Sequence, residues 1–336
     1  MTSMKAIVYE GPNQVACREI PVPVEKEGWV TIQVSHAGIC GSDQTIYRGK
    51  HPRAKAPLVL GHEFSGYITR DMGDFRKGDL VTVFPYLPCH NCERCKNGQF
   101  HVCQNLKLIG IDLDGGMAEY VSVPEWTVCK VPESCTPAQA AFIEPVGISV
   151  HAVRKGGYRP GDSVVIFGAG GIGMATAITL RQFGANPIIA EPNPLRLALA
   201  KEMGFDVLDP KQDTIQQIYA RTGGIGADFV YDCAGAQPVI DLLPDAVRIN
   251  GTIVIVAGYK DPPAMNFQKG MFREFTIQFV RNCTREDFEI ATRLMGQGLG
   301  YDRLLNYIVD IENGAEGFAP PPSAYKVIFE VNHESI

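Results

Sequence analysis

The sequence has no excess of positive charge and no long uninterrupted apolar run. Its 336 residues include 31 Lys and Arg against 37 Asp and Glu, a net charge of −6, and no basic run suggests a nucleic-acid partner. The N-terminus has no signal-peptide pattern. Four glycines interrupt the first half of the longest apolar stretch, residues 164–180, which argues against a membrane span. We therefore expect a cytoplasmic protein with neither nucleic acid nor membrane as a partner.

The ten cysteines do not have the pattern of a disulfide framework, which belongs to small secreted domains. Four of them fall within one short loop, as Cys89-x₂-Cys92-x₂-Cys95-x₇-Cys103, and the others are scattered. Four closely spaced thiolates form a closed tetrahedral ligand set for a structural Zn²⁺. His90 and His101 lie in the same loop but do not fit this ligand spacing. Because the loop has too little core to fold alone, we expect zinc to order it.

The rhythm of the apolar segments changes near residue 160. Residues 1–150 read as short strands and loops broken by Gly and Pro. Beyond them, helix-length segments such as 195–203 and 214–221 separate most of six short apolar runs, at residues 163–167, 187–190, 206–208, 228–232, 252–257 and 275–280. A helix through residue 295 and a terminal strand at 324–331 follow. Strands alternating with helices predict an α/β domain with a doubly wound parallel sheet.

A glycine motif, Gly168-Ala169-Gly170-Gly171-Ile172-Gly173, lies between the first of these runs and a helical segment at 174–183. It is G-x-G-x-x-G in the strand–turn–helix context that dinucleotide binding requires. Gly168 permits the tight turn, Gly170 lets the backbone approach a pyrophosphate, and Gly173 lets helix and strand pack closely. The N-terminus of the helix then supplies free N–H groups to the phosphates.

An acid and a base near the second strand of this domain bear on the choice of cofactor. Glu191 ends that strand, about 20 residues beyond the motif, where a carboxylate would hold the ribose 2′-hydroxyl of NAD. Arg196 follows closely and could instead accommodate the 2′-phosphate of NADP. We expect NAD, with NADP as the less favoured alternative.

Four further motifs give the chain a family resemblance. They are Gly38-Ile39-Cys40-Gly41-Ser42-Asp43, Gly61-His62-Glu63, Asp114-Gly115-Gly116-Met117-Ala118-Glu119-Tyr120 and Glu144-Pro145. With the four-cysteine loop and the glycine motif, they make the chain resemble the zinc-containing medium-chain dehydrogenases, closest to the sorbitol, threonine and galactitol-phosphate dehydrogenase branches. The resemblance implies a GroES-like β-rich catalytic domain, residues 1–150 and 285–336, and a Rossmann domain, residues 151–284. It also implies a homodimer or homotetramer that covers the apolar edge strand at 275–280.

The catalytic residues follow from the resemblance and from zinc chemistry together. A catalytic zinc needs about three protein ligands and one open position. Cys40 and His62 are suitable ligands, and the resemblance makes Glu63 and Glu144 alternative candidates for the third. Zinc would act as a Lewis acid on the substrate hydroxyl, and NAD would accept the hydride. Ser42 has the place of the family's proton-relay hydroxyl, whereas a threonine replaces the histidine that many relatives of this type carry three residues later.

The expected activity is the NAD-linked oxidation of a secondary alcohol in a small polyol, sugar or sugar acid. An amino alcohol such as threonine is the alternative substrate, and a catalytically silent zinc- and nucleotide-binding regulator is the alternative class. Zinc-independent reductases of the same superfamily usually lack Cys40, His62 and the four-cysteine set. A zinc-ribbon nucleic-acid binder would need a basic face, which the acidic composition argues against.

Overall fold

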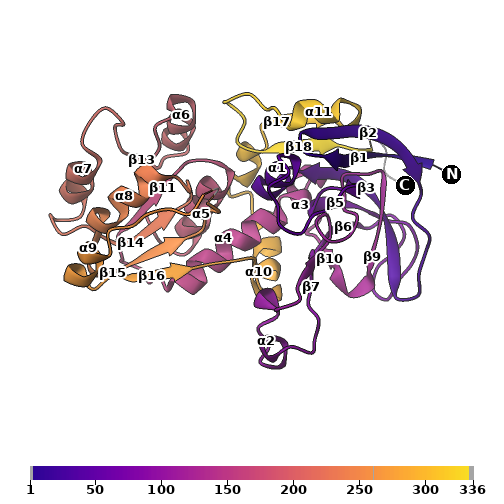
Figure 1. The fold of residues 1–336 in the computed structure, drawn as a ribbon, viewed down its shortest axis with the longest axis horizontal. Coiled ribbons are helices and arrows are strands. Elements are labelled where there is room, and N and C mark those ends of the chain that lie inside the picture. The colour runs from indigo at the N-terminus through magenta and orange to yellow at the C-terminus, as the bar shows by residue number, and fades with distance from the viewer. Residues whose placement is uncertain (1–2, 260, 333–336) are drawn as a thin grey trace. The chain divides into compact units, whose positions relative to one another are not determined.

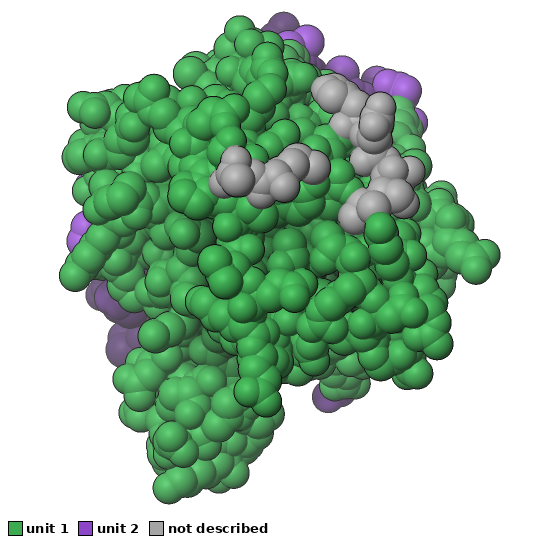
Figure 2. Space-filling view, turned by 90° about the vertical axis from the view of Figure 1, so that its right-hand side faces the viewer, with its two compact units in different colours: residues 1–147, 284–336 green, residues 148–283 purple. Residues whose placement is uncertain are grey.

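The computed structural model describes residues 3–259 and 261–332, and the chain divides into two compact units. Unit 1 comprises Met1–Gly147 and Thr284–Ile336, and unit 2 comprises Ile148–Cys283 (Figures 1 and 2). The boundaries expected from the sequence, after residue 150 and before residue 285, lie within three residues of these divisions. Unit 1 is thus assembled from both ends of the chain.

The described strands of unit 1 form sheets of seven, three and two strands. The largest has the order β10 (Val128–Lys130), β6 (Leu80–Val83), β5 (Glu63–Ile68), β3 (Trp29–Gly38), β18 (Val327–Glu330) and β17 (Tyr307–Asp310), and β9 (Tyr120–Pro124) also pairs with β3. The others are β2 (Gln14–Pro21), β1 (Ser3–Gly11) and β4 (Leu58–Val59), and the pair β7 (Tyr86–Leu87) and β8 (Lys107–Leu108). Because β18 pairs with β3, the C-terminal tail completes a sheet begun by the N-terminal segment (Figure 1).

Most helices of unit 1 are short. They are α1 (Gly41–Tyr47), α2 (Glu93–Lys96), α3 (Pro137–Ala141), α10 (Arg285–Met295) and α11 (Gly314–Gly317), and α4 (Ile143–Gly156) runs from unit 1 into unit 2. The predicted helix ending at residue 295 is α10, which starts at a capping box in which Thr284 and Asp287 bond each other's backbone amides. In the described residues, no helix is both long and apolar enough to cross a membrane.

Unit 2 contains a parallel sheet of six described strands, which confirms the doubly wound sheet predicted from the sequence. Its order is β13 (Asp206–Val207), β12 (Ile188–Ala190), β11 (Val164–Phe167), β14 (Ala227–Asp232), β15 (Val247–Ile255) and β16 (Thr276–Phe279). The helices are α5 (Gly171–Gln182), α6 (Pro194–Glu202), α7 (Thr214–Arg221), α8 (Gln237–Ala246) and α9 (Phe267–Arg273). The chain winds outward from β11 in both directions, so the strand order reverses between β11 and β14, where such sheets bind ligands.

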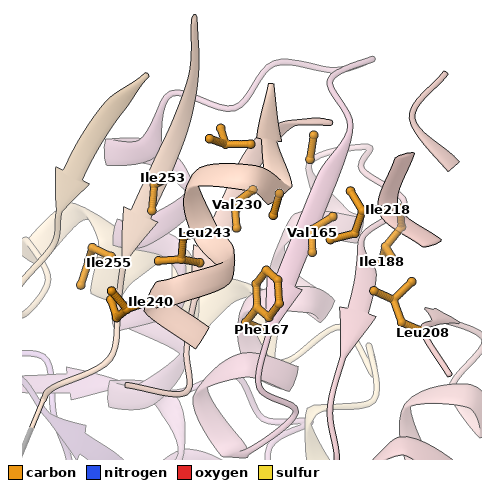
Figure 3. Close-up of a cluster of buried hydrophobic side chains, with 13 residues drawn as sticks. Val165, Phe167, Ile188, Leu208, Ile218, Val230, Ile240, Leu243, Ile253 and Ile255 are labelled. Carbon is orange, nitrogen blue, oxygen red and sulfur yellow. The ribbon is translucent and has the colours of Figure 1, made fainter. Parts of the chain in front are cut away.

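The core of unit 2 explains why its strands read as short apolar runs. Val165 and Phe167 of β11 lie beside Val230 of β14, and Ile240 and Leu243 of α8 cover the same region (Figure 3). Strands covered on both faces carry continuous apolar residues rather than an alternating pattern. Three predicted bounds differ by three residues or more: β15 begins at Val247 rather than at residue 252, β18 begins at Val327 rather than at residue 324, and α5 begins at Gly171 rather than at residue 174. The earlier start brings the N-terminus of α5 into the glycine motif.

Candidate metal centres and cofactor site

Three of the predicted zinc ligands come together in unit 1. One ligand atom each of Cys40, His62 and Glu63 lies within 4.8 Å of the other two. The pairing of β3 with β5 sets Gly38 opposite Glu63, so Cys40, just beyond β3, meets the start of β5. Gly61 turns the chain into this position with a φ of 100°, a conformation that favours glycine. Thiol, imidazole and carboxylate form a donor set that fits a catalytic zinc with one position open.

Asp43 supports two members of this set and is fully buried. Its Oδ2 atom accepts a hydrogen bond from the Cys40 backbone N–H at 2.8 Å, and its Oδ1 atom lies 3.7 Å from His62 Nδ1. Burial raises the pKa of Asp43. Burial alone would lower the pKa of His62, but the negative charges of Asp43 and Cys40 outweigh it and raise the pKa well above its ordinary value. Asp43 therefore holds the Cys40 backbone by a hydrogen bond and acts on the His62 imidazole through its charge.

Ser42 lies beside the same imidazole, with its Oγ atom 3.4 Å from His62 Nε2. Thr45, the threonine that replaces the histidine of many relatives, donates its hydroxyl to the Gly41 carbonyl at 2.9 Å. His51 Nδ1 accepts backbone N–H groups from residues 53 and 54, at 3.3 and 3.1 Å. Thr45 and His51 thus make hydrogen bonds to the backbone, while Ser42 lies next to the candidate metal ligand His62.

Lys326 is a member of this site that the sequence analysis missed. Its ammonium donates to the Ile39 carbonyl at 2.9 Å and to the carboxylate of Glu63. Burial alone would lower the pKa of Lys326, but the Glu63 charge raises it. A Cβ atom on Gly38 would lie 2.5 Å from Glu63 Oε2 and 2.9 Å from Lys326 Cε, so only glycine leaves room for the pair. A lysine inside the apolar C-terminal strand was the signal that could have indicated a buried partner.

Glu144, the other predicted zinc ligand, is buried but is not part of the three-residue cluster. It lies in the first turn of α4 and accepts the hydroxyl of Tyr86, which is also buried. Burial and the charge of Glu63 raise the pKa of Glu144 to about 7. The structure therefore gives each carboxylate its own partner: an ammonium for Glu63 and a phenol for Glu144.

The four predicted cysteines of the loop between β7 and β8 also come together. Their Sγ atoms, of Cys89, Cys92, Cys95 and Cys103, lie within 4.8 Å of one another. Backbone N–H groups point at all four sulfurs, and those of Asn91 and Cys92 lower the pKa of the Cys89 thiol to about 6. His90 instead packs against Phe100, with the rings 5.5 Å apart. A closed set of four thiols fits a structural zinc, and the loop with α2 projects from the body of unit 1 (Figure 1).

The glycine motif of unit 2 has the tight geometry expected of a phosphate-binding turn. Gly168 has a φ of 98°, and a Cβ atom there would lie 3.1 Å from Ala234. A Cβ atom on Gly173 would lie 1.8 Å from the Gly168 carbonyl oxygen, which excludes any other residue. Gly170 has open space, with an Arg196 nitrogen 3.8 Å from its built Cβ position. Gly170 is the N-cap of α5, so Gly171 and Ile172 form the first helical turn.

Glu191 and Arg196 both reach this turn. The buried carboxylate of Glu191 accepts the Ala169 N–H at 2.7 Å and the Asn193 N–H at 2.8 Å. Arg196 lies in the first turn of α6, and its Nε is a buried atom without a hydrogen-bond partner among the described residues. Glu191 thus ties the glycine turn to the end of β12, and Arg196 has an unused donor near the same turn.

Comparison with known proteins agrees with this geometry. Residues 26–133 match the family model of the alcohol dehydrogenase GroES-like domain, and residues 171–297 match that of the zinc-binding dehydrogenases. The chain is 34% identical over 305 residues to L-galactonate-5-dehydrogenase of Escherichia coli, covering 89% of each protein. It is 34% identical over 306 residues to sorbitol dehydrogenase of Halalkalibacterium halodurans, covering 88% of this chain and 89% of that protein.

Two solved structures are similar over nearly the whole chain. A zinc-binding dehydrogenase from Sinorhizobium meliloti, bound to NADP, has a TM-score of 0.92 and 27% identity, covering 98% of this chain and 100% of that one. An alcohol dehydrogenase from Escherichia coli CFT073, in complex with NADH, has a TM-score of 0.89 and 29% identity with the same coverage. These neighbours bind different dinucleotides, so fold similarity alone does not select the cofactor.

Proposed function

This chain belongs to the zinc-containing medium-chain alcohol dehydrogenases, and we propose that it oxidises a secondary alcohol of a polyol, sugar or sugar acid with NAD in the cytoplasm. The observation that carries the proposal is the cluster of the half-buried Cys40 with the buried His62 and Glu63, and with Ser42 beside it. Relatives named for L-galactonate and sorbitol support the substrate class. In this proposal residues 1–150 and 285–336 are the catalytic domain and residues 151–284 bind the cofactor.

The residues of the catalytic cluster would divide the chemistry among them. Cys40, His62 and Glu63 would hold a zinc ion, which supplies Lewis acidity toward the substrate oxygen. Asp43 holds the Cys40 backbone by a hydrogen bond and places its negative charge 3.7 Å from His62 Nδ1. Ser42 Oγ would accept the substrate hydroxyl proton and give its own proton to solvent water, which reaches this partly exposed side chain, since a serine hydroxyl both donates and accepts. Glu144, held by Tyr86, is available as an alternative ligand.

For the cofactor we favour NAD over NADP. In this proposal the Glu191 carboxylate would hold the ribose 2′-hydroxyl, and its charge would repel a 2′-phosphate. Arg196 has an unpartnered Nε near the same turn and supports the alternative. Relative kcat/KM values for the two cofactors test the choice, and a preference for NADP would reverse it.

The four-cysteine loop would carry a second, structural zinc, and unit 2 would carry the subunit contact. Strand β16 is the edge of its sheet, and the apolar side chains of α9 and β16 nearby are largely exposed: Phe267 by 77%, Phe272 by 72% and Phe279 by 67%. A homodimer or homotetramer would cover this edge. We expect Phe272→Asp to lower the molar mass seen by light scattering, and Ile225→Asp, another exposed apolar site, to leave it unchanged.

The activity is tested by NADH absorbance at 340 nm with zinc-loaded protein. Polyols, sugars, sugar acids and threonine are offered with NAD or NADP, and Cys40→Ser is the control variant. Reduction of NAD with a polyol, sugar or sugar acid, lost in Cys40→Ser, supports the proposal. Turnover of threonine alone would favour the amino-alcohol alternative. If protein that binds zinc and dinucleotide reduces no cofactor with any of these substrates, the result would contradict the proposed activity and favour the regulatory alternative.

A further inference from the structure

One buried carboxylate joins the ends of two neighbouring strands in unit 2. Asp232 is the last residue of β14 and is fully buried. Its Oδ1 atom accepts the N–H groups of Ala234 and Gly235, at 2.9 and 3.0 Å. Its Oδ2 atom accepts the hydroxyl of Tyr259, which lies in the loop after β15. The carboxylate therefore fixes the turn after β14 and, through Tyr259, the loop after β15.

The turn held by Asp232 also contacts the glycine motif. A Cβ atom on Gly168 would lie 3.1 Å from both the N and the Cβ atoms of Ala234. On the other side, a Cβ atom on Gly235 would lie 2.8 Å from the Gly258 carbonyl oxygen. Strands β11, β14 and β15 are adjacent in the sheet. Their carboxyl-end turns thus form one continuous layer at the edge where a doubly wound sheet binds its dinucleotide.

Tyr259 closes this layer with two different parts of its side chain. Its ring packs against the hydrophobic cluster of unit 2, which includes Ile240 and Ile255. Only its hydroxyl engages Asp232. Burial and the adjacent carboxylate raise the pKa of Tyr259, so the phenol stays protonated and remains a donor at any working pH. Without the hydroxyl, a buried carboxylate oxygen would lose its partner while the packing of the ring remained.

We propose that Tyr259 is a positioning residue for the dinucleotide: its bond to Asp232 holds the turns after β14 and β15 against the glycine motif in the cofactor-binding arrangement. This inference rests on the proposed function. A fold in which these turns were free would bind cofactor only in the fraction of molecules that has them ordered, so apparent affinity would fall with that fraction. Tyr259 touches no reacting atom in this assignment and acts only through Asp232.

The test is the affinity of the folded full-length protein for NADH and NADPH, measured by fluorescence. Tyr259→Phe keeps the ring and removes the hydroxyl, and we expect a Kd about 5- to 10-fold higher than in the wild type. Tyr219→Phe is the matched control, because Tyr219 packs against the same cluster from α7. Kinetics should show a raised KM for cofactor, with kcat and the KM for alcohol unchanged. A purely structural role would lower the melting temperature without this split.

A second comparison checks that the hydroxyl acts through the carboxylate. Asp232→Asn should weaken cofactor binding, and the double variant with Tyr259→Phe should bind no more weakly than Asp232→Asn alone. A wild-type Kd in Tyr259→Phe, or additive effects in the double variant, would overturn the assignment. Because binding is measured without turnover, a wild type that binds dinucleotide but oxidises no alcohol still tests Tyr259 and contradicts only the proposed activity. A wild type that binds neither dinucleotide overturns both.

Discussion

Replacing Lys326 by methionine should expose how far the catalytic cluster depends on its buried ammonium. The side chains of Lys326 and Glu63 are 8% and 2% exposed. Methionine keeps most of the length of lysine and removes the charge, so Glu63 would keep a buried negative charge without a cation. Removing one partner of a buried pair costs about 3–5 kcal/mol of stability, mostly from the charge left behind. We expect Lys326→Met to lower the free energy of unfolding of metal-free unit 1 by that amount.

The same substitution should cost less in zinc-loaded protein. A divalent cation bound by Cys40, His62 and Glu63 would compensate the carboxylate that has lost its ammonium. Both tryptophans, Trp29 and Trp126, belong to unit 1, so their fluorescence during urea denaturation reports on this unit. The measurement is made with zinc and after chelation. Loss of the four-cysteine metal affects all variants alike and cancels in their difference.

Two variants separate charge from packing. Lys326→Arg keeps the positive charge and should lose less stability than Lys326→Met. Glu63→Gln combined with Lys326→Met removes both charges, and should recover most of the loss in metal-free protein. The reasoning is refuted if Lys326→Met costs under about 1 kcal/mol without metal, or if the cost is the same with and without zinc.

Three further outcomes follow from the site. Ser42→Ala should lower kcat by about 10²-fold or more with little change in cofactor KM; steady-state kinetics retaining most of the wild-type kcat would remove Ser42 from the proton path. Cys92→Ser should reduce the zinc content from two ions per chain to one, measured by atomic absorption, and an unchanged content would reject the four-thiol site. The pKa of Glu144 is about 7 in the folded protein and 4.5 ordinarily. The protonated Glu144 therefore stabilises the folded protein fully below pH 4.5, and this stabilisation is lost as the pH rises through 7. Between pH 4.5 and 7, the free energy of unfolding of the metal-free wild type should therefore fall by on the order of 2–3 kcal/mol relative to that of Glu144→Gln, measured by urea denaturation. The same pH dependence in both proteins would contradict this prediction.

Local spacing made much of this protein readable from its sequence. The cysteines of the β7–β8 loop are close along the chain, and the glycine motif sits between a strand and a helix, so each motif carries its geometry with it. The parallel sheet followed from the alternation of apolar runs and helices. The fold prediction therefore needed little tertiary information.

The parts that the sequence did not predict depend on contacts between distant segments. Lys326 is 263 residues from Glu63, and Tyr86 is 58 residues from Glu144. These pairs arise from how β18 meets β3 and from how α4 packs, which no short motif encodes. The open choice between Glu63 and Glu144 had the same origin. Their surroundings differ through these distant partners, although both are buried glutamates.

The charge balance of the catalytic cluster connects metal binding to the stability of this end of unit 1. Asp43, Glu63 and Glu144 are buried carboxyl groups near the His62 imidazole, and Lys326 supplies a buried ammonium near them. Without metal, burial raises the pKa of Asp43 and of Glu144, so burial opposes the charged form of both carboxyl groups. A divalent cation would favour the charged forms and lower both pKa values. We therefore propose that the buried acids that make the metal-free cluster costly to fold would also give it affinity for zinc, and that Lys326 limits that cost.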